Sequence, residues 1–527
     1  MHVTNSSESR ELDRTAIEDF DLPGIVLMEN AARSILREAL GFWPWLAEPG
    51  CRVIVLSGPG QNGGDGLVLA RLLSAMGHQV HTYIVTKDGR RPTGDAGLNL
   101  SICRKMALPI TVIEDESDPL PDWSWPDLVI DAIFGTGLDK PLEGEPARVL
   151  GSAARWKASG EDLRVLAVDL PSGLCGDTGL AAPEVLPADL TVCLGTMKLG
   201  AYLQKGPELT GELRPGDIGL TPAIIKSAEP KGRILDARLA KTLVPPRPCG
   251  AHKGTFGHAV LLGGSIGKTG ALELASQGAL RSGCGLVTCA HPASLSGVFQ
   301  GKVTEAMTFP LQDKSGELGK TACEAVLELM DKRDCLALGP GLGLGPGQKA
   351  LTRELSKLIP KPMVLDADAL TNLEGSLSIL LDASGPRILT PHPGEAGRLL
   401  GRSAAEIEAD RLGAAQQLSR LSGAVAVLKG RYTIITAPDG RYMINQSGGP
   451  ILSAGGAGDV LTGLMAGLLA QGLGPFEASA LAVHLHGLAG DLAERELGSV
   501  GVTIGEVASY LPAAWSFLAS LSERPGF

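Results

Sequence analysis

The chain has 527 residues, too many for a single hydrophobic core, which predicts at least two domains. Hydrophobic residues make up 44% of it and 70 residues are Gly, a composition typical of an α/β enzyme with many tight βα turns. The net charge of -11 argues against a nucleic-acid-binding surface. It does not exclude phosphate ligands, because backbone N–H groups bind phosphate without net positive charge.

The cysteines and the N-terminus bear on where the protein works. Nine Cys are scattered without a CxxC pair, which predicts neither a disulfide framework nor a zinc site and fits a reducing cytoplasm. The first residues, MHVTNSSESRELDR, are polar and acidic, so we expect no signal peptide. No apolar run approaches the ~20 residues of a membrane helix. We therefore expect a cytoplasmic protein without a membrane partner.

The first half of the chain alternates between helical and strand patterns, beginning with a helical pattern over residues 11–40. A buried strand at residues 51–56 runs into the glycine-rich loop SGPGQNGGDG at residues 57–66, and a helix follows. This order of elements is what a phosphate-binding turn requires. The loop is not a GxGxxG motif with an acidic residue at the usual distance, which disfavours an ordinary NAD dehydrogenase.

Two later strands of this half carry an acidic residue at the carboxyl end. The strand within residues 126–134 ends in Asp131, the strand within residues 164–170 ends in Asp169, and each precedes a turn of small residues. Open α/β sheets bind ligands at this edge. A single Asp there is often only a turn former. Two of them beside a glycine-rich loop indicate a ligand site.

Prolines between residues 221 and 250 indicate a connection. We place the boundary near 225–235, with one domain at 1–225 and the other at 232–527. Beyond the boundary, strands again end in polar residues, and we expect these to meet at one sheet edge. Any one of them can be a satisfied structural group, but their shared position favours a functional one. They are Asp366, Asp368, His392 and Lys429.

The stretch GGAGD at residues 455–459 is followed at once by an apolar helical run at residues 460–470. Small residues let a ligand approach the backbone, and the free N–H groups and dipole of a helix start suit phosphate. Asp459 would be an ionised carboxylate there, able to accept a proton from a hydroxyl. The alternative is a purely structural helix N-cap, for which Asp is favoured. The consistent order of the preceding motifs favours the catalytic interpretation.

The motifs PGIVLMENAA, GPGQNGGDG, DAIFGTGL and AVDLPSG, in this order, resemble the epimerase half of the NAD(P)H-hydrate repair enzymes, the YjeF N-terminal family, over about residues 10–222. The resemblance implies a Rossmann-like three-layer sandwich that inverts the C6 hydroxyl of damaged NADH or NADPH. It also implies a potassium ion held by Asn62, Asp131 and Ser172. The implied contacts to the hydrate are Gln61, Asn62, Gly63, Gly64, Asp65, Gly135, Thr136, Gly137, Leu138, Asp139, Lys140, Pro141 and Asp169.

The chemistry of the hydrate fits these residues. C6 carries both a hydroxyl and the ring nitrogen, so it can invert through loss and return of hydroxide or through ring opening. Either route needs a positioned acid or base, and our candidate is Asp169. Lys198 either faces the same pocket or is a solvated surface residue. Gln61 stands where the family usually has Asn, and its longer arm puts that contact in doubt.

The second half resembles the YjeF C-terminal family, the dehydratase of the same repair pathway, over about residues 232–520. The resemblance implies a ribokinase-like α/β domain that binds the S hydrate and ADP. The family pattern differs at Lys268, Gly449 and Ala457. The implied contacts to the hydrate are Ala271, Gly341, Gly343, His392 and Asp459. The implied contacts to the nucleotide are Lys429, Gly430, Arg431, Tyr432, Thr433 and Gly458.

The resemblance thus implies a bifunctional repair enzyme. One domain would equilibrate the R and S hydrates, and the other would dehydrate the S form at the expense of ADP. Phosphorylation would convert the C6 hydroxyl into a better leaving group, with Asp459 as the base and Mg²⁺ expected on the phosphates. Asp169 and Asp459 are the predicted catalytic residues. We expect small-molecule substrates and a homo-oligomer.

Two alternatives belong to different functional classes. A small-molecule kinase of the ribokinase-like fold would use the GAGD motif in the same way, but this alternative leaves residues 10–222 unexplained. An epimerase-like domain kept only as a binding module would not need Asn62, Asp131 and Asp169. Incubation with NADPH hydrates and ADP separates the three possibilities.

Overall fold

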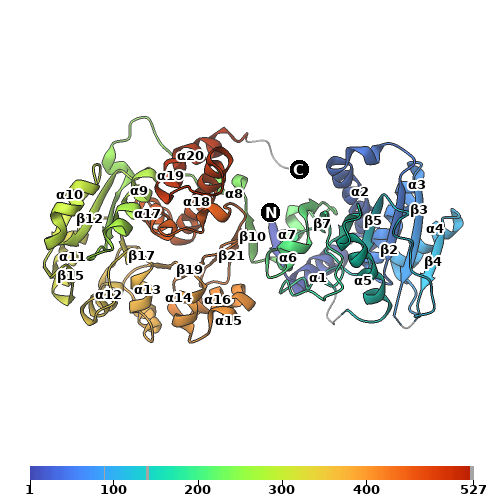
Figure 1. Cartoon of the computed structure of the whole chain (residues 1–527), viewed down its shortest axis with the longest axis horizontal. Helices are drawn as coiled ribbons and strands as arrows, with labels where there is room; N and C mark the ends of the chain where they lie inside the picture. The colour runs from blue at the N-terminus through green and yellow to red at the C-terminus, as the bar shows by residue number, and fades with distance from the viewer. Residues whose placement is uncertain (88, 138–141, 523–527) are drawn as a thin grey trace. The chain divides into compact units, whose positions relative to one another are not determined.

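The computed structural model describes residues 1–87, 89–137 and 142–522, and the chain forms two compact units, Met1–Gly232 and Arg233–Phe527 (Figure 1). Each unit contains a mainly parallel sheet flanked by helices. Among the described residues, no helix combines the length and apolar composition needed to span a bilayer.

The sheet of the first unit has seven strands in the order β4-β3-β2-β5-β6-β7-β9, and every neighbouring pair is parallel. Alternate residues of its strand β2 pack into different apolar clusters: Val53 and Val55 with α2 and α3, Ile54 and Leu56 with α5. The unit is therefore a three-layer sandwich, as predicted. Its strands are β2 (Arg52–Ser57), β3 (Gln79–Val85), β4 (Ile110–Ile113), β5 (Leu128–Ala132), β6 (Arg164–Val168), β7 (Leu190–Leu194) and β9 (Glu212–Gly216).

Helices cover both faces of this sheet, and a short parallel pair of strands, β1 (His2–Thr4) and β8 (Met197–Lys198), lies outside it. The helices are α1 (Ser6–Arg14), α2 (Gly24–Phe42), α3 (Gln61–Ala75), α4 (Gly94–Lys105), α5 (Glu145–Ala158), α6 (Gly206–Leu209) and α7 (Pro222–Ala228). The helical pattern predicted over residues 11–40 is interrupted at residues 20–23. A π-helical turn follows α1, and α2 begins after Pro23, whose extended backbone makes it the N-cap.

The glycine-rich stretch is only partly a loop, because α3 already begins at Gln61. Its glycines serve close packing inside a helix. A Cβ on Gly63 would lie 1.9 Å from the carbonyl oxygen of Gly58, and one on Gly64 would lie 2.4 Å from Met28 of α2. The prediction treated these glycines as loop residues because it could not see the neighbours that exclude a side chain.

The proline-rich stretch after residue 221 is also more regular than its composition indicates. Pro222 opens α7, a position where its missing N–H costs nothing. Strand β10 (Gly232–Leu235) and helix α8 (Ala237–Thr242) follow directly.

In the second unit, β11, β12, β13, β16, β17, β18 and β19 pair in parallel, and β20 and β21 extend the sheet antiparallel. The order is β13-β12-β11-β16-β17-β18-β19-β20-β21-β10. A small hairpin joins β14 (Asp313–Lys314) to β15 (Glu317–Leu318). The sheet strands are β11 (His258–Leu262), β12 (Leu286–Pro292), β13 (Met307–Leu311), β16 (Cys335–Leu338), β17 (Met363–Leu365), β18 (Arg387–Leu389), β19 (Val425–Leu428), β20 (Ile434–Thr436) and β21 (Tyr442–Asn445).

Helices lie on both sides of this sheet: α9, α17 and α18 on one side, α12 to α16 on the other (Figure 1). The main apolar core joins the first group to the strands. The helices are α9 (Thr269–Arg281), α10 (Ser296–Lys302), α11 (Cys323–Met330), α12 (Pro346–Leu358), α13 (Asp368–Asn372), α14 (Pro393–Leu400), α15 (Ala404–Ala409), α16 (Arg411–Ser422), α17 (Ala457–Ala470), α18 (Pro475–Leu497), α19 (Ile504–Ser509) and α20 (Leu511–Ser520).

Helices α9 and α17 cross at backbone contact distance. A Cβ on Gly278 would lie 2.1 Å from the carbonyl oxygen of Val460, and one on Gly463 would lie 1.8 Å from that of Ala275. Only glycine permits this approach. The crossing fixes the N-terminal end of α17, which carries the GAGD motif, against α9.

Candidate active sites

The first unit holds a cavity of about 540 Å³ at the carboxyl ends of its strands. Many of the residues predicted to contact a hydrate line it, but Gly63 and Gly64 do not, nor do the predicted potassium ligands Asp131 and Ser172. Leu138, Asp139, Lys140 and Pro141 lie outside the described residues. The predicted residues on its wall are Gln61, Asn62, Asp65, Gly135, Thr136, Gly137 and Asp169.

Asp169 is held by three hydrogen bonds and one ion pair. Its Oδ2 accepts from the backbone N–H of Thr136 (3.1 Å) and the Thr136 hydroxyl (3.2 Å), and its Oδ1 accepts from the N–H of Leu194 (3.1 Å). Lys198 Nζ lies 3.1 Å from Oδ1. The backbone of Asp169 has φ +67°, a left-handed conformation that is uncommon for a non-glycine residue. These contacts fix the carboxylate at the edge of the cavity.

Lys198 is buried, with 3% of its side chain exposed, so the surface alternative is wrong. Besides its ion pair with Asp169, its ammonium donates to the carbonyls of Leu194 (2.6 Å) and Thr196 (3.0 Å). An ammonium has three N–H donors. Two of them are donated to these carbonyls, and the ion pair with Asp169 also holds the ammonium in place.

Gly135 closes the wall between Asn62 and Asp169. A Cβ at this position would lie 2.8 Å from Asp169 Oδ2 and 3.0 Å from Asn62 Oδ1. Real Cβ atoms do not approach oxygen that closely, so a larger residue here would displace one of these side chains. The small turn after β5 is thus part of the geometry of the cavity.

Beneath this wall, Asp131 and Ser172 form a cluster of buried oxygen atoms. Ser172 donates from its N–H to Asp131 Oδ2 (2.8 Å) and from its hydroxyl to Oδ1 (2.6 Å), and it accepts from the N–H of Phe134 (2.8 Å). Burial raises the pKa of Asp131 to about 6 against these hydrogen bonds. The amide Nδ2 of Asn62 is buried without a hydrogen-bond partner. Hydroxyl, carboxylate and amide oxygens suit a hard cation.

Two further acids face the cavity. Asp65 is 6% exposed, and its pKa is raised well above the ordinary value by burial and then by the charges of Asp169 and Asp13. Asp13 reaches the same cavity from α1. Desolvation raises the pKa of Asp13 too, against the charge of Lys198. The sequence analysis missed Asp13, because no motif marks it.

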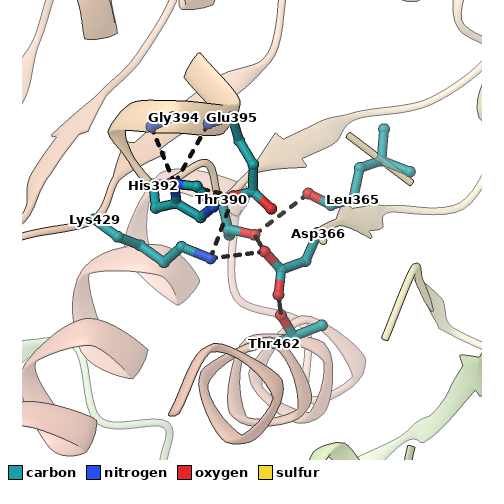
Figure 2. Close-up of polar contacts among 8 residues, drawn as sticks. All are labelled: Leu365, Asp366, Thr390, His392, Gly394, Glu395, Lys429 and Thr462. Carbon is teal, nitrogen blue, oxygen red and sulfur yellow. Dashed lines mark hydrogen bonds and ion pairs between the residues drawn. The ribbon is translucent and has the colours of Figure 1, made fainter. Parts of the chain in front are cut away.

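In the second unit, the ends of β17, β18 and β19 bring an ion pair together with two hydroxyls, as Figure 2 shows. Lys429 Nζ lies 2.9 Å from Asp366 Oδ1, which also accepts from the Thr390 hydroxyl (2.7 Å). Asp366 Oδ2 accepts from the Thr462 hydroxyl of α17 (2.7 Å). Burial opposes the charged form of Asp366, but Lys429 and the hydroxyls hold its pKa below the ordinary value.

His392 forms the N-cap of α14 (Figure 2). The ring Nδ1 of His392 accepts from the backbone N–H of Gly394 (3.0 Å), and the backbone N–H of His392 donates to Glu395 Oε2 (2.9 Å). Burial and the charge of Lys429 lower the pKa of His392, so the ring is neutral at pH 7. Glu395, 3.8 Å from Lys429 Nζ, was missed as a site residue, although HPGE is a capping-box pattern.

Asp459 does not cap α17. The N-cap is Gly456, with φ +99°, and Asp459 is the third helical residue. The structural alternative is therefore wrong. Its carboxylate has no hydrogen-bond partner within the described part of the chain. The ionised form that the dipole favours meets an opposing effect, because burial and the charge of Asp366 outweigh Lys429 and raise the pKa of Asp459 to about 7.

Gly458 lies between Asp459 and the ion pair. A Cβ on Gly458 would lie 3.2 Å from Lys429 Nζ and 3.6 Å from Asp366 Oδ2. The GAGD motif is therefore adjacent to the strand-end cluster, as the sequence predicted.

A second group of predicted residues gathers at the start of α9. Asp368 accepts from the N–H of Gly343 (2.8 Å) and pairs with Lys268 (2.9 Å). A Cβ on Gly341 would lie 2.5 Å from the carbonyl oxygen of Lys268 and 3.4 Å from the Cβ of Ala271. Ala271, Gly341 and Gly343 are thus brought together.

The segment 430–433 is shaped by Arg411, another residue that the sequence analysis missed. Its guanidinium donates to the carbonyls of Arg431 and Lys429, the latter at 3.3 Å. Tyr432 has φ +53°, and the Arg431 guanidinium lies over its ring.

No cluster of three or more His, Cys, Asp or Glu that could hold a metal occurs in residues 1–87, 89–137 and 142–522.

The two halves match different protein families. Residues 24–200 match the family described as YjeF-related protein N-terminus, and residues 259–513 match the NAD(P)H-hydrate dehydratase family. The second half is also similar to the ADP/ATP-dependent NAD(P)H-hydrate dehydratase from Bacillus subtilis co-crystallised with ATP and Mg²⁺, at 30% identity and a TM-score of 0.49. That similarity covers 54% of this chain and 98% of the other.

Full-length relatives contain both halves. The bifunctional NAD(P)H-hydrate repair enzyme Nnr of Moorella thermoacetica is 40% identical over 517 residues, which cover 97% of this chain and 96% of the relative. The Escherichia coli protein of the same name is 34% identical over 97% of this chain and 93% of its own length. The chain therefore belongs to the family of bifunctional NAD(P)H-hydrate repair enzymes, and the resemblance that the motifs indicated is confirmed.

Proposed function

We propose that the first unit interconverts the R and S hydrates of NADH and NADPH, and that the second dehydrates the S hydrate with ADP, giving AMP and phosphate. The observation that carries this proposal is that each unit has its own Lys–Asp ion pair at the carboxyl ends of its strands, with a further acid of raised pKa beside it. A lone kinase would leave the first of these sites without a use.

In the first unit, the hydrate would lie in the cavity against the turn 135–137 and the start of α3. Asn62, Asp131 and Ser172 would hold a potassium ion, because their amide, carboxylate and hydroxyl oxygens are ligands that suit a hard cation. The ion would supply a positive charge that orients the ligand. Asp169, fixed by Lys198, would face positive charge that develops on the ring of the hydrate.

In the second unit, the turn 341–343, Ala271, His392 and Asp459 would contact the hydrate. Asp459 would take the proton of the C6 hydroxyl, whose oxygen then attacks the β-phosphorus of ADP while AMP leaves. Loss of phosphate from C6 and of a proton from C5 restores the ring. A pKa of about 7 suits a base at neutral pH. N–H groups at the start of α17 would stabilise the transferred phosphoryl group.

The nucleotide would lie along Lys429, Gly430, Arg431, Tyr432 and Thr433, with Gly458 near its phosphates. Mg²⁺ would supply charge neutralisation on the phosphates. The described residues offer it no acidic cluster, which fits a metal held mainly by the nucleotide. Lys268, one of the departures from the family pattern, is engaged by Asp368 and half exposed.

The test is to incubate the full chain with a mixture of NADPH hydrates and ADP and to follow absorbance at about 340 nm, where the dihydronicotinamide absorbs. Complete recovery from both epimers supports both activities. Recovery that stops when the S hydrate is consumed would show that the first unit does not epimerise. No recovery, with phosphate transfer to another hydroxyl compound, would favour a kinase.

A further inference from the structure

We propose that Asp65 is the proton donor and acceptor at C6 during epimerisation, an inference that rests on the proposed function of the first unit. Asp65 lines the cavity, is 6% exposed, and has no hydrogen-bond or ion-pair partner among the residues that the structure describes. A buried carboxyl group without a partner is costly unless a ligand engages it.

The fold leaves Asp65 no protein partner and directs it to the cavity. It lies in the first turns of α3, where Gly64 and Gly66 let the helix approach α2 and the sheet closely. Burial and the charges of Asp169 and Asp13 favour its neutral form by raising its pKa. Burial therefore favours the carboxylic acid form of Asp65, which has a proton to donate.

Asp169, the acid/base candidate from the sequence, is less suited to moving a proton. Both of its oxygens already accept hydrogen bonds, and Lys198 pairs with one of them. Such contacts occupy its oxygens within the protein, so neither is left free to take a proton from a ligand. Asp169 serves better as a fixed negative charge, and Asp65 as the group that gains and loses a proton.

The other charged groups on the cavity wall come from several elements. They are Asp13 of α1, Arg90 after β3, Asp95 of α4, Asp169 after β6 and Lys198 of β8. Asp13 precedes residues 24–200, the part matched by the N-terminal family, and its charge is one of the causes that raise the pKa of Asp65. Asp13 is therefore a positioning residue, which acts through Asp65 by favouring its protonated form.

The proposed step conserves atoms and charge. The C6–O bond breaks with its electron pair on oxygen, Asp65 gives that oxygen a proton, and water forms. The lone pair of N1 forms a C6=N1 double bond, and the resulting cation faces Asp169. The planar cation then turns its other face toward Asp65, and water attacks C6 on that face and returns a proton to Asp65. No external oxidant or further reactant is needed.

The experiment starts from pure S NADPH hydrate without ADP and follows the appearance of the R epimer by chromatography. Asp65→Asn keeps the shape but cannot exchange the proton, so epimerisation should fall by roughly 10²–10⁴-fold. Dehydration of S hydrate after ADP is added reports the second unit in the same sample. Asp162→Asn, at an acid whose side chain is 78% exposed, is the matched control and should epimerise normally.

Asp13→Asn supplies a second readout that does not depend on Asp65→Asn folding. Removing this negative charge should lower the pKa of Asp65, so the alkaline fall in epimerisation should begin at lower pH. In water enriched in ¹⁸O, each inversion by the unmutated chain should place one labelled oxygen at C6. Inversion that retains the original oxygen would overturn the proposed step.

Different results would contradict the role of Asp65 and the proposed function of the first unit. If the unmutated chain does not epimerise, the proposed function of the first unit is wrong. If it does, but Asp65→Asn epimerises at the unmutated rate or Asp13→Asn leaves the pH profile unchanged, Asp65 is not the proton carrier.

Discussion

The two sites use the same parts for opposite purposes. Each has a Lys–Asp pair with a buried Asp, at 3.1 Å in the first unit and 2.9 Å in the second, and a nearby carboxyl group without a hydrogen-bond partner in the described structure. In the second, Lys429 counters the rise in the pKa of Asp459, which stops at about 7. In the first, the neighbours that set the pKa of Asp65 are acids. A lysine near Asp459 therefore favours its role as a base, whereas the acids around Asp65 favour its role as a proton donor.

The largest expected effect comes from removing the base of the second site. Asp459→Asn should lower dehydration of S hydrate by roughly 10²–10⁴-fold, because an amide cannot accept the hydroxyl proton. Epimerisation should stay normal and serves as the internal control. Nucleotide affinity should survive, since backbone N–H groups bind the phosphates. A variant that dehydrates normally would move the base elsewhere, with His392 the next candidate.

The wall of the first site should be almost as sensitive. Gly135→Ala would place a Cβ 2.8 Å from Asp169 Oδ2 and 3.0 Å from Asn62 Oδ1, so one of them must move. A displacement of this kind can cost about 10²-fold in rate. We expect a loss of that order in epimerisation and none in dehydration. Gly41→Ala is the matched control, because a Cβ there meets only the flexible end of the Arg214 side chain, at 3.4 Å. Similar losses in both variants would contradict the steric explanation.

A pH series sharpens the comparison further. Because Asp459 acts as a base with a pKa of about 7, dehydration should fall about tenfold per pH unit below that value. Epimerisation, which needs Asp65 protonated, should persist there. Lys429→Met should move the dehydration profile to higher pH, since loss of the cation raises the pKa of Asp459. Initial rates from pH 5 to 9, about the range of stable protein folding, give both profiles.

The same pKa has a consequence for stability. The unfolded chain ionises Asp459 near 3.8, whereas the folded chain does so near about 7, so this group lowers the free energy of unfolding as pH rises between these values. Asp459→Asn should therefore unfold at a higher temperature than the unmutated chain at pH 8. The difference should vanish near pH 3. A lower midpoint at pH 8 would show that the carboxylate stabilises the fold.

The smallest effect that we expect concerns the monovalent cation. Replacing potassium by sodium should slow epimerisation several-fold and leave the first-unit fold intact, because Asp131 and Ser172 keep their mutual hydrogen bonds. Measurement of the epimerisation rate at constant ionic strength excludes general screening. Equal rates in both salts would remove the cation from the proposal.

The sequence predicted the polar residues at successive strand ends, but it missed the contacts between elements that are far apart in the chain. Apolar strands with polar ends placed Asp131, Asp169, Asp366 and Lys429 correctly, because parallel strands share one functional edge. Nothing local linked Asp13 to Asp65, or Arg411 to the segment that it shapes. Such contacts depend on packing between elements far apart in sequence.

The pKa values could not be predicted for the same reason. A helix start favours a charged carboxylate, which suggested that Asp459 is ionised. Burial and the charge of Asp366 oppose that preference, and neither is visible in GGAGD. The start of α3 was misplaced because glycine is a poor helix former in isolation. Close neighbours explain why it is kept there.

Because α9 and α17 pack closely at their glycines, helix α17 and the segment before it should differ in the rate of amide hydrogen exchange. The middle of α17 is buried on all sides, so its amide hydrogens should exchange with solvent only when the whole unit unfolds. Residues 453–455, just before it, are exposed and should exchange quickly. A phosphate can therefore order this short segment on binding without disturbing the helix that carries Asp459.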